Sequence, residues 1–143
     1  MMSKIVAIQG NHPTTLNPKT DTTIFLASEI QSKKYKIFYY DPKNLSIVKS
    51  QIIADGFFVK FDYKKKNFFR VIKKQKLELK DCKFILIRQD PPFNIEYIST
   101  TYILDTIKNK VKIVNNPTSI RNISEKLYSP KYQKFMPDTL FSQ

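Results

Sequence analysis

The chain has 143 residues, a formal net charge of +13, 41% hydrophobic residues and one cysteine, Cys82. This length suits one domain with a buried core, and the hydrophobic content excludes a wholly disordered chain. No apolar run approaches the length needed to span a bilayer, and a single cysteine excludes an internal disulfide and a cysteine-based zinc site. These features predict a cytoplasmic protein of one domain, with Cys82 in or near the core.

The positive charge has two interpretations. Clustered basic residues attract polyanions, because their binding to a phosphate backbone releases counterions. However, only three of the 25 basic residues are arginine, the residue suited to bidentate recognition of phosphates and bases. The lysines also accompany many Asn, Ile, Tyr and Phe residues, a mixture that an A/T-rich genome produces without any partner. A basic module that binds nucleic acid or another polyanion stays an alternative, although nucleic acid is not the partner that we expect.

The first forty residues predict a strand, a loop, a helix and a second strand. Residues 4–9 form an apolar run that ends at Gly10, and a loop rich in Asn, Pro and Thr follows. Hydrophobic residues recur at helical spacing over 22–33, and Asp21 precedes them as an N-cap. Residues 35–40 are β-branched and aromatic, which predicts a strand. This order is typical of the start of a doubly wound sheet.

The next segment alternates apolar and polar residues, which indicates half-exposed antiparallel strands. Strands are expected at Leu45–Lys49, Ile52–Tyr63 and Asn67–Val71, with breaks at Ser50-Gln51, Asp55-Gly56 and Lys64–Asn67. We expect these strands to form a meander inserted between the two halves of a parallel sheet, with its lysines facing solvent.

The last part of the chain returns to the pattern of a parallel sheet. A strand is expected over 83–88, a helix over 94–108, a short strand over 111–114, helical turns at 119–123 and 124–128, and a short helix over 129–135. The predicted fold is therefore α/β and Rossmann-like, with a mostly parallel sheet flanked by helices and an inserted antiparallel meander.

Three polar loops follow strands at the same predicted edge of this sheet: Asn17–Asp21, Arg88–Asn94, and the segment from Asn115 to Lys126. In open α/β sheets, ligands bind at the carboxyl ends of the strands. Arg88 could hold a carboxylate, and the amides after Asp21 could hold an anion. The alternative is structural, with Asp21 as a helix cap and Arg88 paired with Asp90. Each residue alone favours the structural role, whereas the three loops together favour a ligand cleft.

Standard catalytic machinery is absent from the sequence. The two glycines, Gly10 and Gly56, are too few for a dinucleotide fingerprint or a phosphate-binding P-loop. The only histidine, His12, lies in a loop and is expected at the surface, and no carboxylate cluster indicates a metal site. We expect no complete active site within this chain.

Five motifs occur in order along the chain: Asn17-x-Lys19-x-Asp21-Thr22, Arg88-Gln89-Asp90-Pro91-Pro92-Phe93, Thr101-Tyr102-Ile103-Leu104, Asn115-Asn116-Pro117-Thr118-Ser119-Ile120-Arg121 and Ser124-Glu125-Lys126-Leu127-Tyr128. In this order they resemble the N-terminal domain of bacterial glutathione synthetase. The resemblance covers the whole chain, and residues 136–140 are similar to the family's crossing into its ATP-grasp region. Residues 42–80 contribute little to it.

The resemblance implies a pre-ATP-grasp substrate domain at residues 1–136, with 137–143 as the start of a linker to an ATP-grasp domain. Enzymes of the family use ATP and Mg²⁺ to convert the cysteinyl carboxylate of γ-glutamylcysteine into an acyl phosphate, which glycine then attacks. The resemblance also implies a homo-oligomer. Because the glycine-rich loops, metal-binding carboxylates and most of the adenine site belong to the other domain, we expect no turnover from these residues alone. We expect the chain to be either a piece of a longer enzyme or a natural truncation.

Carried over residue by residue, the resemblance assigns Asn17, Asp21, Arg88 and Asp90 to the peptide substrate. It assigns Lys126 to a nucleotide contact at the domain junction. The family loop usually reads Arg-Lys-Asp-Pro-Pro-Phe-Asp, whereas this chain has Gln89 and Asn94 at the second and last positions. The local charge sum is unchanged, but roles tied to those two charges do not carry over.

Besides the polyanion-binding module, one further alternative stays open. The chain could be a non-catalytic interaction domain, in which an oligomer buries the ancestral cleft.

Overall fold

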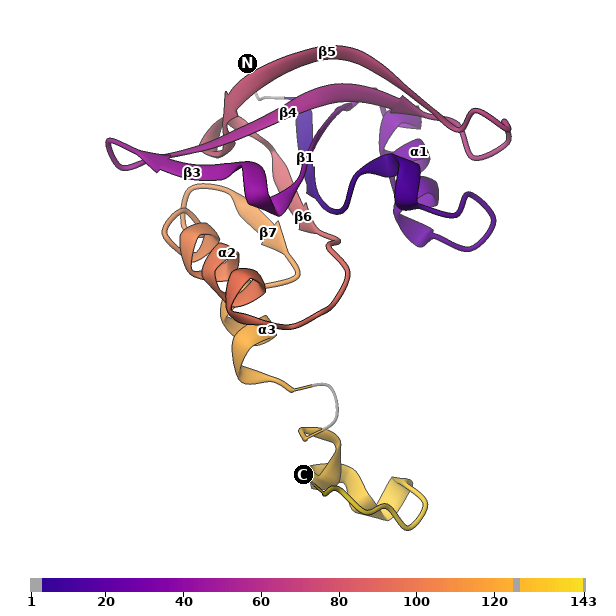
Figure 1. The fold of residues 1–143 in the computed structure, drawn as a ribbon, viewed down its shortest axis with the longest axis vertical. Helices are drawn as coiled ribbons and strands as arrows, with labels where there is room; N and C mark the ends of the chain where they lie inside the picture. Colours follow the sequence, from indigo (N-terminus) through magenta and orange to yellow (C-terminus); the bar gives the residue numbers. More distant parts are fainter. Residues whose placement is uncertain (1–3, 125–126, 143) are drawn as a thin grey trace.

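The computed structural model describes residues 4–124 and 127–142 and contains a seven-stranded sheet with helices on both faces (Figure 1). Its parallel strands are β1 (Ile5–Gln9), β2 (Lys36–Tyr40), β6 (Phe84–Ile87) and β7 (Lys112–Val114). β1 pairs with β2 on one side and with β6 on the other, and β7 follows beside β6. The predicted α/β class with a mostly parallel, helix-flanked sheet is confirmed.

Three antiparallel strands extend the same sheet beyond β2: β3 (Leu45–Val48), β4 (Gln51–Phe61) and β5 (Phe69–Glu78). The long strand β4 pairs with both β2 and β3 along one side and with β5 along the other. The predicted meander is therefore continuous with the main sheet.

Two details of the predicted meander are wrong. β4 runs through Asp55 and Gly56 without a break, and β5 continues seven residues past the expected end at Val71, to Glu78. A Cβ atom at Gly56 would lie 2.3 Å from the backbone oxygen of Tyr39 on β2. Gly56 is therefore needed where two strands approach closely, and it does not mark a turn.

The helices are α1 (Thr22–Ser32), α2 (Ile95–Asp105) and α3 (Pro117–Asn122), with short 3₁₀ helices η1 (Pro13–Thr15), η2 (Pro42–Asn44), η3 (Leu79–Asp81) and η4 (Ser129–Phe135). α1 follows the predicted range closely, and the carboxylate of Asp21 accepts a hydrogen bond of 2.7 Å from the backbone N–H of Thr23. α2 ends at Asp105, three residues before the predicted end. The helical turn predicted at 124–128 lies partly outside the described residues.

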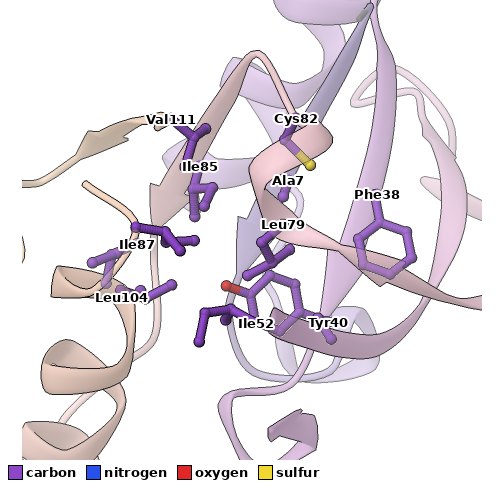
Figure 2. Close-up of a cluster of buried hydrophobic side chains, with 12 residues drawn as sticks. Ala7, Phe38, Tyr40, Ile52, Leu79, Cys82, Ile85, Ile87, Leu104 and Val111 are labelled. Carbon is purple, nitrogen blue, oxygen red and sulfur yellow. The ribbon is translucent and has the colours of Figure 1, made fainter. Parts of the chain in front are cut away.

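Each face of the sheet has its own hydrophobic core, because successive residues of a strand point to opposite faces. Val6 and Ile8 of β1 pack on the face that α1 covers, whereas Ala7 packs on the opposite face with Leu104 of α2. Figure 2 shows this second core, in which the Tyr40 ring lies among aliphatic side chains and Cys82 is buried as expected. Within the described residues, no helix combines the length and apolar character needed to cross a membrane.

Candidate functional site

The carboxyl ends of β1, β2 and β6 meet at one edge of the sheet, beside a cavity of about 750 Å³. The residues that follow these strands line it, together with the first half of α2: Asn11, His12, Thr15, Asp41, Pro42, Lys43, Gln89, Asp90, Pro91, Pro92, Asn94, Ile95, Glu96, Tyr97, Ser99 and Thr100. This is the edge at which open α/β sheets bind ligands. We call this space the edge cavity.

Three consecutive residues after β6 are attached to three different parts of the fold. The Arg88 guanidinium donates to the hydroxyl groups of Thr22 (2.6 Å) and Thr23 (3.1 Å) at the start of α1. The side chain of Gln89 points to the other face and accepts a hydrogen bond from the amide of Gln9. The backbone N–H of Asp90 donates to the side-chain oxygen of Asn11, at 3.3 Å. The loop is thus fixed on both faces of the sheet, while the Asp90 side chain lies exposed at the edge cavity.

Several charged residues at this edge of the sheet lie close enough to the hydroxyl group of Tyr39 to influence its pKa. Burial is the largest cause that raises the pKa of Tyr39 well above its usual range, and the carboxylates of Asp21, Asp90 and Asp41 add to it. Arg88 acts in the opposite direction. Because such influences require proximity, Asp21 of the first predicted loop lies in one electrostatic neighbourhood with Arg88 and Asp90 of the second.

The first loop supports its own conformation. The side-chain oxygen of Asn17 accepts a hydrogen bond from the Lys19 N–H (3.0 Å), and its backbone oxygen accepts one from Asp21 (2.8 Å). Asp21 in turn caps α1. Asn17 and Asp21 therefore shape the loop beside Arg88, and neither side chain forms part of the edge-cavity wall.

The third segment is attached to α2 through Arg121. Its guanidinium forms an ion pair with Asp105, donates to the hydroxyl group of Thr101 at 3.1 Å and lies 4.1 Å from the ring centre of Tyr102. Burial alone would raise the pKa of Asp105, but hydrogen bonds from Arg121, Thr118 and Lys108 outweigh it and hold this pKa below its usual value. Arg121 is thus committed to holding α3 against α2.

A second cavity of about 880 Å³ lies on the other side of the Arg88–Asn94 loop, between it, α3 and the C-terminal residues Leu127, Phe141 and Ser142. The two cavities share Gln89, Pro91 and Tyr97 on their walls, and neither has a residue of Asn17–Asp21. The structure therefore does not bring all three predicted loops to a single cleft. Lys126 lies outside the described residues.

Residues 5–121 match the family model of the prokaryotic glutathione synthetase N-terminal domain. The chain belongs to this family. It is 34% identical over 142 residues to the glutathione synthetase of Brucella melitensis, covering 99% of this chain and 46% of that protein. Identity is 33% to the enzymes of Mesorhizobium japonicum (96% of this chain, 44% of that protein) and Buchnera aphidicola (91% and 41%). The chain spans less than half the length of these relatives.

Several residues of the edge cavity had not been predicted as site residues. Asp41 follows β2 at the same edge and accepts a hydrogen bond from the Lys43 N–H at 2.9 Å. The sequence could have indicated Asp41 as a site residue, because it follows a predicted strand and precedes a proline. His12 is exposed, as expected, but it also lines the cavity, with its ring centre 5.8 Å from that of Phe57.

The most informative of the missed residues in this domain is Gln9, a fully buried glutamine at the end of the central strand β1. The hydroxyl group of Tyr40 donates to its side-chain oxygen at 3.0 Å, and its side-chain nitrogen faces Thr100 at 3.5 Å and Gln89. The sequence could have indicated Gln9, because it is a polar residue at the end of an apolar run.

Among the residues that the structure describes, no group of three or more His, Cys, Asp or Glu side chains is arranged to hold a metal ion. The polar groups that line the edge cavity are carboxylates, amides and hydroxyl groups, with the imidazole of His12 and the ammonium of Lys43. Such groups can orient a substrate by charge and hydrogen bonding.

Proposed function

We propose that the chain is the substrate-side domain of a glutathione synthetase, which ligates γ-glutamylcysteine to glycine while ATP is converted to ADP and phosphate through an acyl phosphate. One observation carries this proposal. Every residue that lines the edge cavity lies within the range 5–121 that the family model matches. The segment that defines the family is thus also the segment that builds a substrate-sized space at the ligand-binding edge of the sheet.

The charges of the edge cavity support a role in holding the peptide. Its wall includes the carboxylates of Asp41, Asp90 and Glu96, against one lysine, Lys43. An excess of carboxylates favours a positively charged group, and γ-glutamylcysteine has one free ammonium group. We assign this ammonium to Asp90, because its exposed side chain extends from a loop whose backbone is fixed.

Arg88 is proposed to bind a carboxylate of the peptide on the α1 side of the loop. Its guanidinium donates to two neutral hydroxyl groups, which orient it without neutralising its charge. Asn17 and Asp21 are proposed to contact the peptide from the first loop, which they hold in shape.

The remaining functions are assigned to the part of the enzyme outside this chain. ATP and Mg²⁺ are proposed to bind mainly to an ATP-grasp domain, with Lys126 as a contact to the nucleotide from this side. In this proposal residues 1–136 form the substrate domain, 137–143 begin the linker, and the complete enzyme is a homo-oligomer. This division is consistent with the share of the relatives that the chain covers.

The direct test uses the enzyme that contains both this chain and its ATP-grasp domain. It should release phosphate from ATP only when γ-glutamylcysteine and glycine are both present. Phosphate release that requires a different acid or amine would overturn the substrate assignment.

Asp90→Asn should raise the KM for γ-glutamylcysteine about tenfold or more, because a charge-assisted contact becomes a neutral one. kcat should change much less, since bond formation is assigned to the other domain. The matched control is Asp62→Asn, at the exposed hairpin between β4 and β5, where the carboxylate pairs with Lys65. An unchanged KM in Asp90→Asn would remove this residue from the site.

A further inference from the structure

Gln9 lies in a place where a polar side chain needs an explanation. It is completely buried in the central strand of the sheet, beside Tyr40 of β2 and Ile87 of β6. On the same face, the preceding inward residue of β1 is Ala7, which belongs to a hydrophobic core. Burying an amide costs free energy unless its polar atoms are hydrogen-bonded. An apolar side chain of equal length would fill this space without that cost.

The partners of Gln9 come from three other elements. Its oxygen accepts the Tyr40 hydroxyl at 3.0 Å, and its nitrogen faces both the Thr100 hydroxyl of α2 at 3.5 Å and the side-chain oxygen of Gln89. Gln9 itself is not on the wall of the edge cavity, but Thr100 and Gln89 are. The buried amide thus connects two side chains of the cavity wall from behind.

The connection also bears on Asp90, the next residue of the loop. Arg88 attaches the loop to α1 on one face, and Gln89 attaches it to Gln9 on the other. Because the side chains of Arg88 and Gln89 are both held, the backbone that leads to Asp90 is fixed. The Asp90 N–H donates to the side-chain oxygen of Asn11, and the Asp90 side chain is exposed. Within the described residues, the side chain of Gln89 has one hydrogen bond, the one from Gln9. Without the Gln9 amide, Gln89 would no longer hold the loop on this face of the sheet.

We propose that Gln9 is a positioning residue, which fixes Gln89 and through it orients Asp90 for the substrate. This inference rests on the proposed function, because Asp90 is the assigned ligand of the peptide ammonium. Gln9 makes no contact with the substrate, and its contribution is the conformation of the Arg88–Asn94 loop.

The test compares Gln9→Met with Gln31→Met in the complete enzyme. Methionine keeps the length of glutamine and removes its amide. Gln31 is the matched control, because its amide also joins two elements: it donates to the Phe61 oxygen (2.8 Å) and accepts from the Phe61 N–H (2.9 Å), away from the edge cavity. Gln9→Met should speed hydrogen exchange at the Asp90 amide about tenfold and raise the KM for γ-glutamylcysteine to a similar extent. Gln31→Met should do neither.

A second variant, Gln89→Ala, removes the same hydrogen bond by changing its other partner, which is only half-buried. This variant keeps the test valid if Gln9→Met does not fold. It should reproduce the faster exchange at Asp90, and the double variant should show much less than the product of the two effects. Unchanged exchange in both single variants, or a KM that rises equally in Gln31→Met, would overturn the positioning role.

Hydrogen exchange needs no substrate. A wild-type enzyme inactive with γ-glutamylcysteine would therefore contradict the proposed function, while the exchange result would still decide how Gln9 acts on the loop.

Discussion

Arg88 and Arg121 show how the partners of a side chain separate a candidate ligand from a structural support. Arg121 pairs with Asp105 and stacks on Tyr102, so its charge is compensated within the protein. The Arg88 guanidinium donates to the neutral hydroxyl groups of Thr22 and Thr23, and within residues 4–124 and 127–142 it forms no ion pair. A guanidinium that is oriented but not neutralised can still attract a carboxylate, which favours Arg88 over Arg121 as a ligand.

The Arg121–Asp105 pair should make stability depend on pH. Asp105→Asn should lower the free energy of unfolding at pH 7 by about 1–2 kcal/mol. Because the pKa of Asp105 is lower in the folded than in the unfolded protein, this stabilisation is complete above the unfolded value of about 4 and is lost as pH falls through the folded one. Urea unfolding at neutral and acidic pH checks this expectation, with the exposed Asp81→Asn as control. A difference between wild type and Asp105→Asn that grows in acid would contradict it.

At the scale of elements, β4 joins the antiparallel strands to the parallel ones. Gly56 lies at the closest approach: an added Cβ would meet the Tyr39 backbone oxygen at 2.3 Å and the Tyr40 Cβ at 2.9 Å. Tyr39 and Tyr40 belong to opposite cores, so neither side of β2 can move without disturbing packed side chains. The position of β4 relative to β2 therefore depends on this glycine.

Gly56→Ala should destabilise the protein by about 2–4 kcal/mol, because the methyl group forces backbone atoms apart in the middle of the sheet. Urea unfolding measures the loss. Lys76→Ala, an exposed change on the neighbouring strand β5 opposite Asp55, should leave the midpoint nearly unchanged. If both variants unfolded at the same urea concentration as the wild type, the close approach would not constrain the sheet.

At the scale of the whole molecule, the net charge of +13 is poorly compensated. The described residues form four ion pairs, and the lysines of β5, Lys73, Lys74 and Lys76, have exposed side chains. Within the part of the chain that the structure describes, β5 pairs with β4 alone, and lysines on such an edge discourage pairing with other chains. Their mutual repulsion also opposes the compact state.

Raising NaCl from about 0.02 M to about 0.5 M should therefore raise the Tm by a few degrees, as salt screens the repulsion between lysines. Calorimetry at several NaCl concentrations measures this shift. A variant with Lys73, Lys74 and Lys76 changed to Gln should show a smaller rise. A Tm that falls over this range would indicate that the few ion pairs outweigh the repulsion.

Most elements could be predicted from the sequence because their signals are local. The cap at Asp21 and the helix that follows depend on neighbouring residues, and both are confirmed. The ordered motifs resembled a family, which the match over residues 5–121 confirms. β5 was predicted too short because its later residues, including Lys73 and Lys74, do not alternate. Residues 70–74 of this edge strand are all exposed, so nothing requires them to alternate.

The sequence by itself determined the α/β elements, the family and the three polar loops, since each depends on residues that are close along the chain. Only the tertiary structure decided which side chains meet. Gln9 and Gln89 are 80 positions apart, and Arg88 and Thr23 are 65 apart. Their contacts arise because β1 lies between β2 and β6, and because neighbouring residues after β6 point to opposite faces of the sheet. That geometry places Asp90 at the edge cavity and Arg88 on α1, a separation that no local pattern specifies.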